Sequence, residues 1–225
     1  TIRIEYNGSN EYFKILKQYY NFTVHKIPVN VTMNVTEVKY GQTGTITITL
    51  SPDTARLYGN LYIDGKLVKE NLVITKTITQ TINRVVGRYN LTLIVNEDEY
   101  YSGGMATTMF IVNKWETNLT LESKDINAGE DAILNITINP GDVRGDIILE
   151  INGVNQSGYL SAATTQITLT NLQNGTYHVT VYYPGDRKYA PSSASTTFNV
   201  ARKSTQLNVT ITNNPDLTGN IIVRT

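Results

Sequence analysis

Apolar and polar residues alternate strictly along several short segments of this 225-residue chain. Residues 45–50 read Thr-Ile-Thr-Ile-Thr-Leu, and residues 134–138 read Leu-Asn-Ile-Thr-Ile. A period of two residues predicts β-strands with one buried side and one solvent-facing side. No segment shows a 3.6-residue period long enough for a helix, so the chain is predicted to be all-β.

The pattern also repeats over a longer interval. A Phe-x-Val motif begins at Phe22, Phe110 and Phe198, so the spacing is 88 residues twice (110 − 22 and 198 − 110). The same offset links six further pairs of identical residues: Gly41 and Gly129, Pro52 and Pro140, Gly65 and Gly153, Gly87 and Gly175, Tyr89 and Tyr177, and Tyr101 and Tyr189. We therefore predict two complete tandem repeats, at 25–112 and 113–200. Residues 1–24 are then the C-terminal part of a preceding repeat, and 201–225 the N-terminal part of a following one.

Each repeat is predicted to contain about seven short antiparallel strands. Asp64-Gly65 and Asn152-Gly153 are typical of two-residue type I′ hairpin turns, in which both central residues have φ > 0. Seven antiparallel strands in about 90 residues indicate a two-sheet sandwich of the immunoglobulin type. The predicted fold is thus a tandem array of immunoglobulin-like (Ig-like) antiparallel β-sandwiches.

Tyr89 and Tyr177 each follow a glycine by two residues, at the expected start of the sixth strand. Ig-type sandwiches carry a tyrosine corner here, in which the hydroxyl of a buried ring bonds to nearby backbone. We assign both tyrosines this structural role. Two other hallmarks are missing, because the chain has no cysteine and its single Trp115 lies at the junction between the repeats.

The end of the second repeat, NGTYHVTVYYPGDRKYAPSSASTTFNV (174–200), resembles the group 3 Ig-like repeats of bacteria and archaea. Residues 87–112 carry a looser version, GRYNLTLIVNEDEYYSGGMATTMFIV, and the N-terminal fragment keeps YNGSNEY and FTV. Such repeats occur in series in large adhesin-like surface proteins, especially those of methanogenic archaea. The resemblance implies display at the cell surface by a longer protein. Glu97 replaces the usual glycine of the loop, so this hairpin is expected to differ in shape.

Composition excludes several function classes. The 19 basic and 19 acidic residues cancel, so the basic surface of a nucleic-acid binder is missing. No apolar run approaches the roughly 18 residues that span a bilayer. With no cysteine and two histidines that do not align, the sequence offers no parts for zinc or acyl-transfer chemistry. We expect no enzyme activity and no cofactor.

Ten Asn-x-Ser/Thr sequons are candidate glycosylation sites. They begin at Asn7, Asn21, Asn30, Asn34, Asn90, Asn118, Asn135, Asn155, Asn174 and Asn208. Those at positions 30, 90, 118, 135 and 208 alternate with apolar neighbours and are expected to face solvent. A threonine-rich exposed strand face also produces this motif by chance, so modification and coincidence both stay open.

An acidic loop, Asn96–Glu99, is a candidate Ca²⁺ site near Asp98, because clusters of oxygen ligands bind this ion. The matching loop of the second repeat keeps only Asp186 and adds Arg187 and Lys188. This difference favours a solvated hairpin tip over a metal site.

Three pairs of adjacent tyrosines stand out, at Tyr19-Tyr20, Tyr100-Tyr101 and Tyr182-Tyr183. In a strand one ring of each pair faces outward, and an exposed tyrosine suits contact with a sugar or a protein. High strand propensity near domain junctions is the simpler interpretation.

An isopeptide crosslink, which some surface repeats contain, is not expected here. Lys26 and Lys114 repeat at the start of each unit, but Asn199 aligns with Ile111 and with Thr23. No acceptor residue repeats with the lysines.

We therefore expect an extracellular spacer that displays a binding region. In a first alternative the repeats themselves bind glycans or proteins of another cell. In a second, neighbouring copies join head to tail into a filament by strand complementation, because the strands expected at Ile2–Tyr6, Phe22–Val24, Leu207–Ile211 and Gly219–Val223 cannot close a core. Pairing of the N-terminal strands only within their own fragment would count against the filament.

Overall fold

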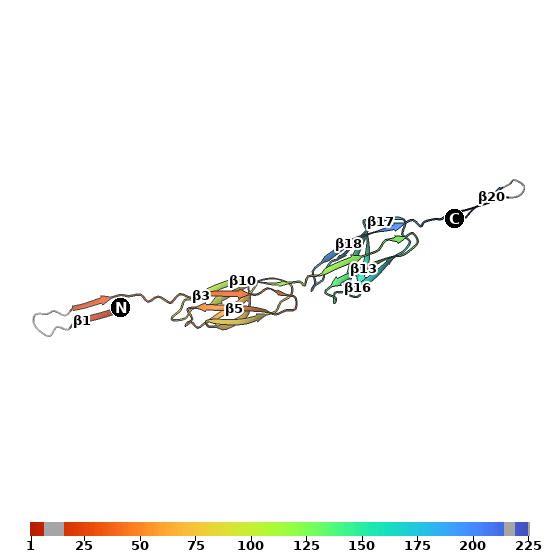
Figure 1. The fold of residues 1–225 in the computed structure, drawn as a ribbon. Helices are drawn as coiled ribbons and strands as arrows, with labels where there is room; N and C mark the ends of the chain where they lie inside the picture. Colours follow the sequence, from red (N-terminus) through yellow and green to blue (C-terminus); the bar gives the residue numbers. More distant parts are fainter. Residues whose placement is uncertain (7–15, 214–218, 225) are drawn as a thin grey trace, which may run out of the picture. The chain divides into compact units, whose positions relative to one another are not determined.

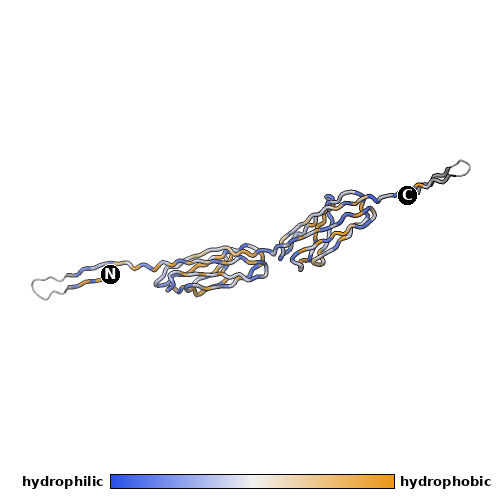
Figure 2. Tube along the Cα trace, viewed as in Figure 1, coloured by the Kyte–Doolittle hydropathy of each residue, from blue (hydrophilic) through white to orange (hydrophobic). Residues whose placement is uncertain are grey.

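The computed structural model describes residues 1–6, 16–213 and 219–224 of the chain. All the elements formed by these residues are β-strands, and they divide between two compact units, Thr1–Asn113 and Lys114–Thr225. Each unit contains one β-sandwich (Figure 1). Hydrophobic and hydrophilic residues alternate along the strands of both sandwiches (Figure 2), as the sequence pattern predicts.

The sandwich of unit 1 has eight strands. They are β3 (Asn30–Val35), β4 (Val38–Lys39), β5 (Gly44–Ser51), β6 (Leu57–Ile63), β7 (Lys66–Ile74), β8 (Thr77–Ile82), β9 (Gly87–Val95) and β10 (Gly104–Asn113). One sheet has the order β3-β5-β8, and the other has the order β4-β10-β9-β6-β7. The inner faces of both sheets supply the core, in which Ile48, Leu91 and Phe110 are fully buried.

Unit 2 repeats this topology. Its strands are β11 (Asn118–Glu122), β12 (Ile126–Asn127), β13 (Ala132–Asn139), β14 (Gly145–Ile151), β15 (Val154–Leu160), β16 (Thr164–Leu169), β17 (Gly175–Tyr183) and β18 (Ser192–Ala201). The sheet orders are β11-β13-β16 and β12-β18-β17-β14-β15. Five of the eight strands begin and end 88 residues after their counterparts in unit 1. The prediction of tandem Ig-like sandwiches is confirmed.

The opening strand differs from the prediction in both units. It is divided into two parts, so each sandwich has eight strands instead of about seven. In unit 1, β3 pairs antiparallel with β5, and the chain then crosses to the other sheet, where β4 pairs parallel with β10. Unit 2 has the same parallel pair, β12 with β18. By changing sheets, the opening segment covers one edge of each sheet.

The two predicted hairpin turns have the expected backbone. Asp64 and Gly65 have φ of 47° and 76°, and Asn152 and Gly153 have φ of 48° and 83°. Each turn is also fixed to a third strand. The Oδ1 atom of Asp64 accepts a hydrogen bond of 2.9 Å from the N–H of Asn90 on β9, and Asn152 makes the matching bond to β17 at 2.8 Å.

Strand β7 is where the two units differ most. β14 and β15 keep one register over seven residue pairs, whereas β6 and β7 shift register on both sides of Leu61. β7 is therefore nine residues long and β15 seven. The connections before and after β8 are each one residue shorter than those around β16, which restores the 88-residue spacing.

The N-terminal fragment forms a hairpin of β1 (Ile2–Tyr6) and β2 (Leu16–Tyr20). The prediction of a strand at Phe22–Val24 is wrong, and these side chains are exposed by 59% and 80%. In the complete units the same motif lies at the end of a strand and faces an opposing sheet, which the fragment lacks. Among the described residues, β1 pairs only with β2, and this pairing counts against the filament hypothesis.

The C-terminal fragment forms a second hairpin, of β19 (Asn208–Asn213) and β20 (Gly219–Arg224). The two strands pair antiparallel, as β11 does with β13. β20 therefore matches the second long strand of a sandwich.

Candidate functional site

No catalytic or metal centre is present in the part of the chain that the structure describes. Within residues 1–6, 16–213 and 219–224, no three His, Asp or Glu side chains are grouped so that they could hold a metal ion. No helix among these residues is long and apolar enough to cross a membrane. The candidate sites are therefore surfaces, loops and modification sites.

Asp98, the centre of the candidate calcium loop, accepts hydrogen bonds from its own loop. Its Oδ1 atom lies 2.8 Å from the N–H nitrogen of Tyr100 and 2.7 Å from that of Tyr101. Asp186 binds the N–H groups two and three residues further on in the same way, at 2.7 and 2.6 Å. Both aspartates shape the turn before the last strand, which favours the hairpin-tip interpretation of Asp98.

Tyr89 and Tyr177 have the geometry of a tyrosine corner. The Tyr89 hydroxyl donates to the carbonyl of Val85 at 3.0 Å, and the Tyr177 hydroxyl donates to the carbonyl of Gln173 at 3.1 Å. Both rings are half-buried, not buried as expected. Each packs on the Phe of the Phe-x-Val motif, with centroids 6.3 and 5.3 Å apart. The contacts support a structural role.

Three interacting side chains, those of Asp142, Lys188 and Tyr189, hold the last loop of unit 2 in place. The Nζ atom of Lys188 lies 2.9 Å from Oδ2 of Asp142 and 4.5 Å above the ring of Tyr189. Hydrogen bonds from the Tyr189 hydroxyl and from Lys188 lower the pKa of the Asp142 carboxyl. In unit 1 the matching ring, Tyr101, places its hydroxyl 3.0 Å from the Thr54 hydroxyl instead. The loop is tied to the same neighbouring segment in both units, by different chemistry.

The sequence pattern did not single out Tyr183 as a core residue, although its side chain is buried in unit 2. It stands where unit 1 has Val95, is 1% exposed, and its hydroxyl has no hydrogen-bond partner within bonding geometry. Burial, together with the negative charge of Asp186 nearby, raises its pKa to about 12. A buried hydroxyl without a partner is expected to lower stability, and the carboxylate of Asp186 is the charged acceptor near it.

Most described sequon asparagines are exposed. They are Asn21, Asn30, Asn34, Asn90, Asn118, Asn155, Asn174 and Asn208. Asn135 is an exception to the prediction, because it is half-buried on β13 and its Oδ1 atom accepts a 2.8 Å hydrogen bond from Gln166. Asn7 lies outside the described residues. Exposure makes the eight sites accessible to a glycosyltransferase, while Asn135 would have to give up a side-chain contact.

Of the two tyrosine pairs that lie in strands, only the pair in a sandwich has one buried and one exposed ring. Tyr182 on β17 is 41% exposed, and Tyr183 beside it faces the core. Tyr100 is 65% exposed, but it precedes β10 in a loop. Tyr19 and Tyr20 are both exposed, at 62% and 49%, because the N-terminal hairpin has no opposing sheet.

Tyr182 belongs to an apolar cluster on the outer face of the larger sheet of unit 2. Ile148 on β14 pairs directly with Tyr182 on one side and with Ser157 on the other. Tyr159 is the next outward-facing residue along β15. Ile148 is 42% and Tyr159 56% exposed, and we call these three residues the outer patch. Two acidic residues flank Ile148 on the same face of β14, Asp146 and Glu150. Exposed aromatic and aliphatic side chains of this kind are suited to contact with another molecule.

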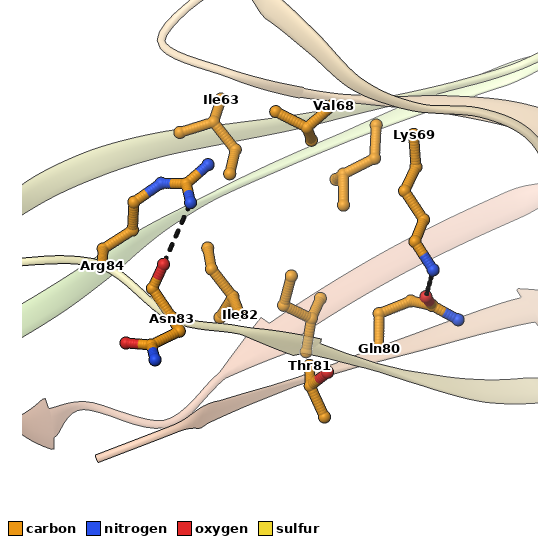
Figure 3. A pocket seen from close by; sticks show the side chains of 10 residues that line it. Ile63, Val68, Lys69, Gln80, Thr81, Ile82, Asn83 and Arg84 are labelled. Carbon is orange, nitrogen blue, oxygen red and sulfur yellow. Dashed lines mark hydrogen bonds between the residues drawn. The ribbon is translucent and has the colours of Figure 1, made fainter. Parts of the chain in front are cut away.

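Unit 1 has a groove on the side where β7 and β8 lie (Figure 3). The groove has a volume of about 220 Å³. At its rim, Nζ of Lys69 donates to Oε1 of Gln80 at 2.7 Å, and Arg84 donates to the carbonyl of Asn83 at 3.0 Å. Its apolar lining residues are Ile46, Leu61, Ile63, Val68 and Ile82. β7, which contributes to this groove, is two residues longer than β15. The sequence did not reveal this difference, because the repeat length is the same in both units.

The residues considered for an isopeptide crosslink have other partners. Nζ of Lys26 forms an ion pair of 2.9 Å with Glu97, and Oδ1 of Asn199 accepts a 2.8 Å hydrogen bond from Thr176. This agrees with the sequence argument against a crosslink.

The two sandwiches define the protein as a tandem array of Ig-like domains, a fold that is typically non-catalytic. Residues 119–201 match the family model described as bacterial Ig-like domain (group 3). No curated protein matches the chain.

Two solved structures are similar to this chain. The fibronectin(III)-like modules of Clostridium thermocellum CbhA are 16% identical, with a TM-score of 0.32, and the match covers 77% of this chain and 95% of the other. Titin domains Z1Z2, solved in complex with telethonin, are 14% identical, with a TM-score of 0.49, and the match covers 80% and 100%.

Proposed function

We propose that this chain is a non-enzymatic, extracellular segment of a surface protein, in which tandem Ig-like repeats act as a spacer for a binding region. The connection between the two cores carries the proposal. β10 ends at Asn113, and the N–H of Trp115 already bonds to the carbonyl of Lys188 in unit 2 at 2.9 Å. One residue, Lys114, therefore lies between the last strand of unit 1 and the first of these backbone bonds in unit 2. So short a connection restricts relative motion, as a spacer requires.

Two further observations support an extracellular location. The match of residues 119–201 to the bacterial group 3 domain relates unit 2 to a family of surface-protein modules. Eight sequon asparagines are exposed, and glycans are carried on such sites in secreted proteins. The flanking fragments 1–24 and 201–225 are parts of further repeats in this proposal.

A distance measurement between spin labels tests the spacer role. The chain has no cysteine, so Thr107→Cys and Ser195→Cys place one label on the outer face of each larger sheet. We expect a narrow distance distribution, and we expect insertion of about ten Gly and Ser residues after Lys114 to broaden it. A broad distribution in the chain without the insertion would contradict a spacer.

The outer patch favours a second candidate, in which unit 2 itself binds a glycan or a protein of another cell. A glycan array and a cell pull-down with the whole chain separate the two roles, because a spacer gives no signal. A signal that the double variant Tyr159→Ser, Tyr182→Ser removes, while Thr107→Ser keeps it, would support a binding module.

A further inference from the structure

β15 is an edge strand of the larger sheet of unit 2. Among the described residues it pairs with β14 alone, so its other side presents backbone N–H and C=O groups that no strand covers. Proteins normally protect such an edge with charged residues, proline or a β-bulge, because an open edge pairs with other chains.

Unit 1 protects the matching edge in two of these ways. β7 carries Lys66, Lys69 and Glu70, and its register with β6 shifts twice. β15 has the sequence Val-Asn-Gln-Ser-Gly-Tyr-Leu, with no charge and no proline, and its register with β14 is unbroken. The protection in unit 1 is thus missing in unit 2.

The absence of charge extends well beyond β15. Residues 151–185 contain no Asp, Glu, Lys or Arg, whereas the matching residues 63–97 contain eight. The uncharged segment includes β15, β16 and β17, so the edge strand itself is neutral. Its neighbour β14 carries Asp146 and Glu150, which pair with Tyr159 and Asn155. Val154, which is 62% exposed, and the outer patch add apolar surface beside this edge. An uncharged edge with exposed apolar residues is suited to association.

We propose that β15 pairs antiparallel with β15 of a second copy of this chain, so that two five-stranded sheets join into one ten-stranded sheet across a two-fold axis. A second copy fits because a two-fold interface must be complementary to itself. Identical neutral edges meet without burying a charge, which a charged partner strand would do. With the axis at Ser157, Asn155 of each copy lies opposite Tyr159 of the other, on the outer face.

A charge placed on the edge tests the proposal. Gln156 pairs with Leu149 in the same way that Lys69 pairs with Leu61 at the matching place in unit 1. Gln156→Lys therefore gives the edge of unit 2 the charge that protects the edge of unit 1. We expect the whole chain, made without N-glycans because Asn155 lies on this strand, to dimerise in analytical ultracentrifugation. Gln156→Lys should raise the dimer dissociation constant at least tenfold, which corresponds to a loss of about 1.4 kcal/mol in the free energy of dimerisation. Thr107→Lys, on the outer face of β10 in unit 1, should leave it unchanged.

A crosslinking experiment does not depend on the Lys variant. Because the chain has no cysteine, Ser157→Cys should form a disulfide-linked dimer under mild oxidation, since opposed strand residues have Cβ atoms about 4.5–5.5 Å apart. Thr107→Cys should not. The proposal is overturned if the chain is monomeric at about 1 mM, if Gln156→Lys and Thr107→Lys dimerise alike, or if both cysteine variants crosslink equally.

Discussion

Units 1 and 2 have the same eight strands but differ on one side of the sandwich. In unit 1 the edge strand β7 is charged and bulged, and a groove opens between it and β8. In unit 2 the matching strand β15 is uncharged and regular, and an apolar patch lies beside it on the outer face of the sheet. The repeat length, the turns and the tyrosine corner are kept in both. The comparison shows that the buried framework is repeated, while the edge at β7 and β15 is free to diverge.

Even the core diverges where these two strands meet. Gly59 on β6 pairs with Leu72 on β7, whereas the matching pair in unit 2 is Ile147 with Gly158. A Cβ atom on Gly59 would lie 2.8 Å from Cδ1 of Ile74, and one on Gly158 would lie 2.7 Å from Cδ1 of Leu149. Each pair therefore joins one glycine to one large residue, but on opposite strands. Core volume is kept by exchange across the pair.

The largest expected effect tests whether the two cores are independent. Phe198→Ala should lower the free energy of unfolding of unit 2 by about 3–5 kcal/mol, because Phe198 is fully buried. Phe110→Ala should do the same in unit 1. Urea unfolding, followed separately for each unit by hydrogen exchange, gives both values.

Phe22→Ala is the matched control, because Phe22 begins the same motif but is 59% exposed. We expect its effect to lie within about 0.5 kcal/mol. A comparable loss in unit 1 when Phe198 is truncated would show that the two cores unfold as one.

The next prediction concerns the exchanged glycine. Gly158→Leu should destabilise unit 2 by about 1–3 kcal/mol, since the new side chain meets Leu149 and Ile147. The double variant Ile147→Gly, Gly158→Leu reproduces the arrangement of unit 1. Chemical denaturation of the two single variants and the double should give a favourable coupling of about 0.5–3 kcal/mol. Simple additivity would mean that the two positions do not share one volume.

The sequence predicted the features that depend on period and turn chemistry. Alternation in residues 45–50 and the 88-residue offset were enough for the strands, and Asp64-Gly65 was enough for the hairpin turn. The division of the opening strand was missed because β4 has only two residues, and so short a strand has no period. The groove was missed because two extra residues in β7 are cancelled by shorter connections around β8.

Side-chain environments were predicted less well, because they depend on contacts distant in sequence. Asn135 has the alternation of an exposed residue, but Gln166 on the neighbouring strand binds it. Phe22 has the motif of a core residue, but its fragment supplies no opposing sheet. The uncharged segment 151–185 was readable in the sequence, but its significance comes from the edge position of β15.

A change at Tyr183 is expected to have a smaller effect, and to increase stability where the preceding variants decrease it. Tyr183→Phe should raise the free energy of unfolding of unit 2 by about 1 kcal/mol, because it removes a buried hydroxyl without a partner. The counterpart in unit 1, Val95, has no such group. Denaturation at pH 7 measures the gain. A loss of stability would show that the hydroxyl donates to Asp186.

The pH dependence of the same variant sharpens this test. The pKa of Tyr183 is raised to about 12, while an unfolded tyrosine titrates near 10. Between these values the unfolded chain releases the proton and the folded chain keeps it, so the free energy of unfolding falls as the pH rises. Tyr183→Phe should reduce this fall. An unchanged pH dependence would contradict the assignment.

The smallest effect concerns the corner tyrosines, where the two units should agree. Tyr177→Phe and Tyr89→Phe each remove one hydrogen bond, to Gln173 and Val85. Both rings are half-buried and both acceptor residues exposed, so water can replace the hydroxyl and we expect losses of about 0.5–1 kcal/mol. Each loss should be confined to its own unit in residue-resolved hydrogen exchange. If Tyr177→Phe weakened unit 1 as much as unit 2, the units would be a single cooperative structure, and the freedom of their edges to diverge would need another explanation.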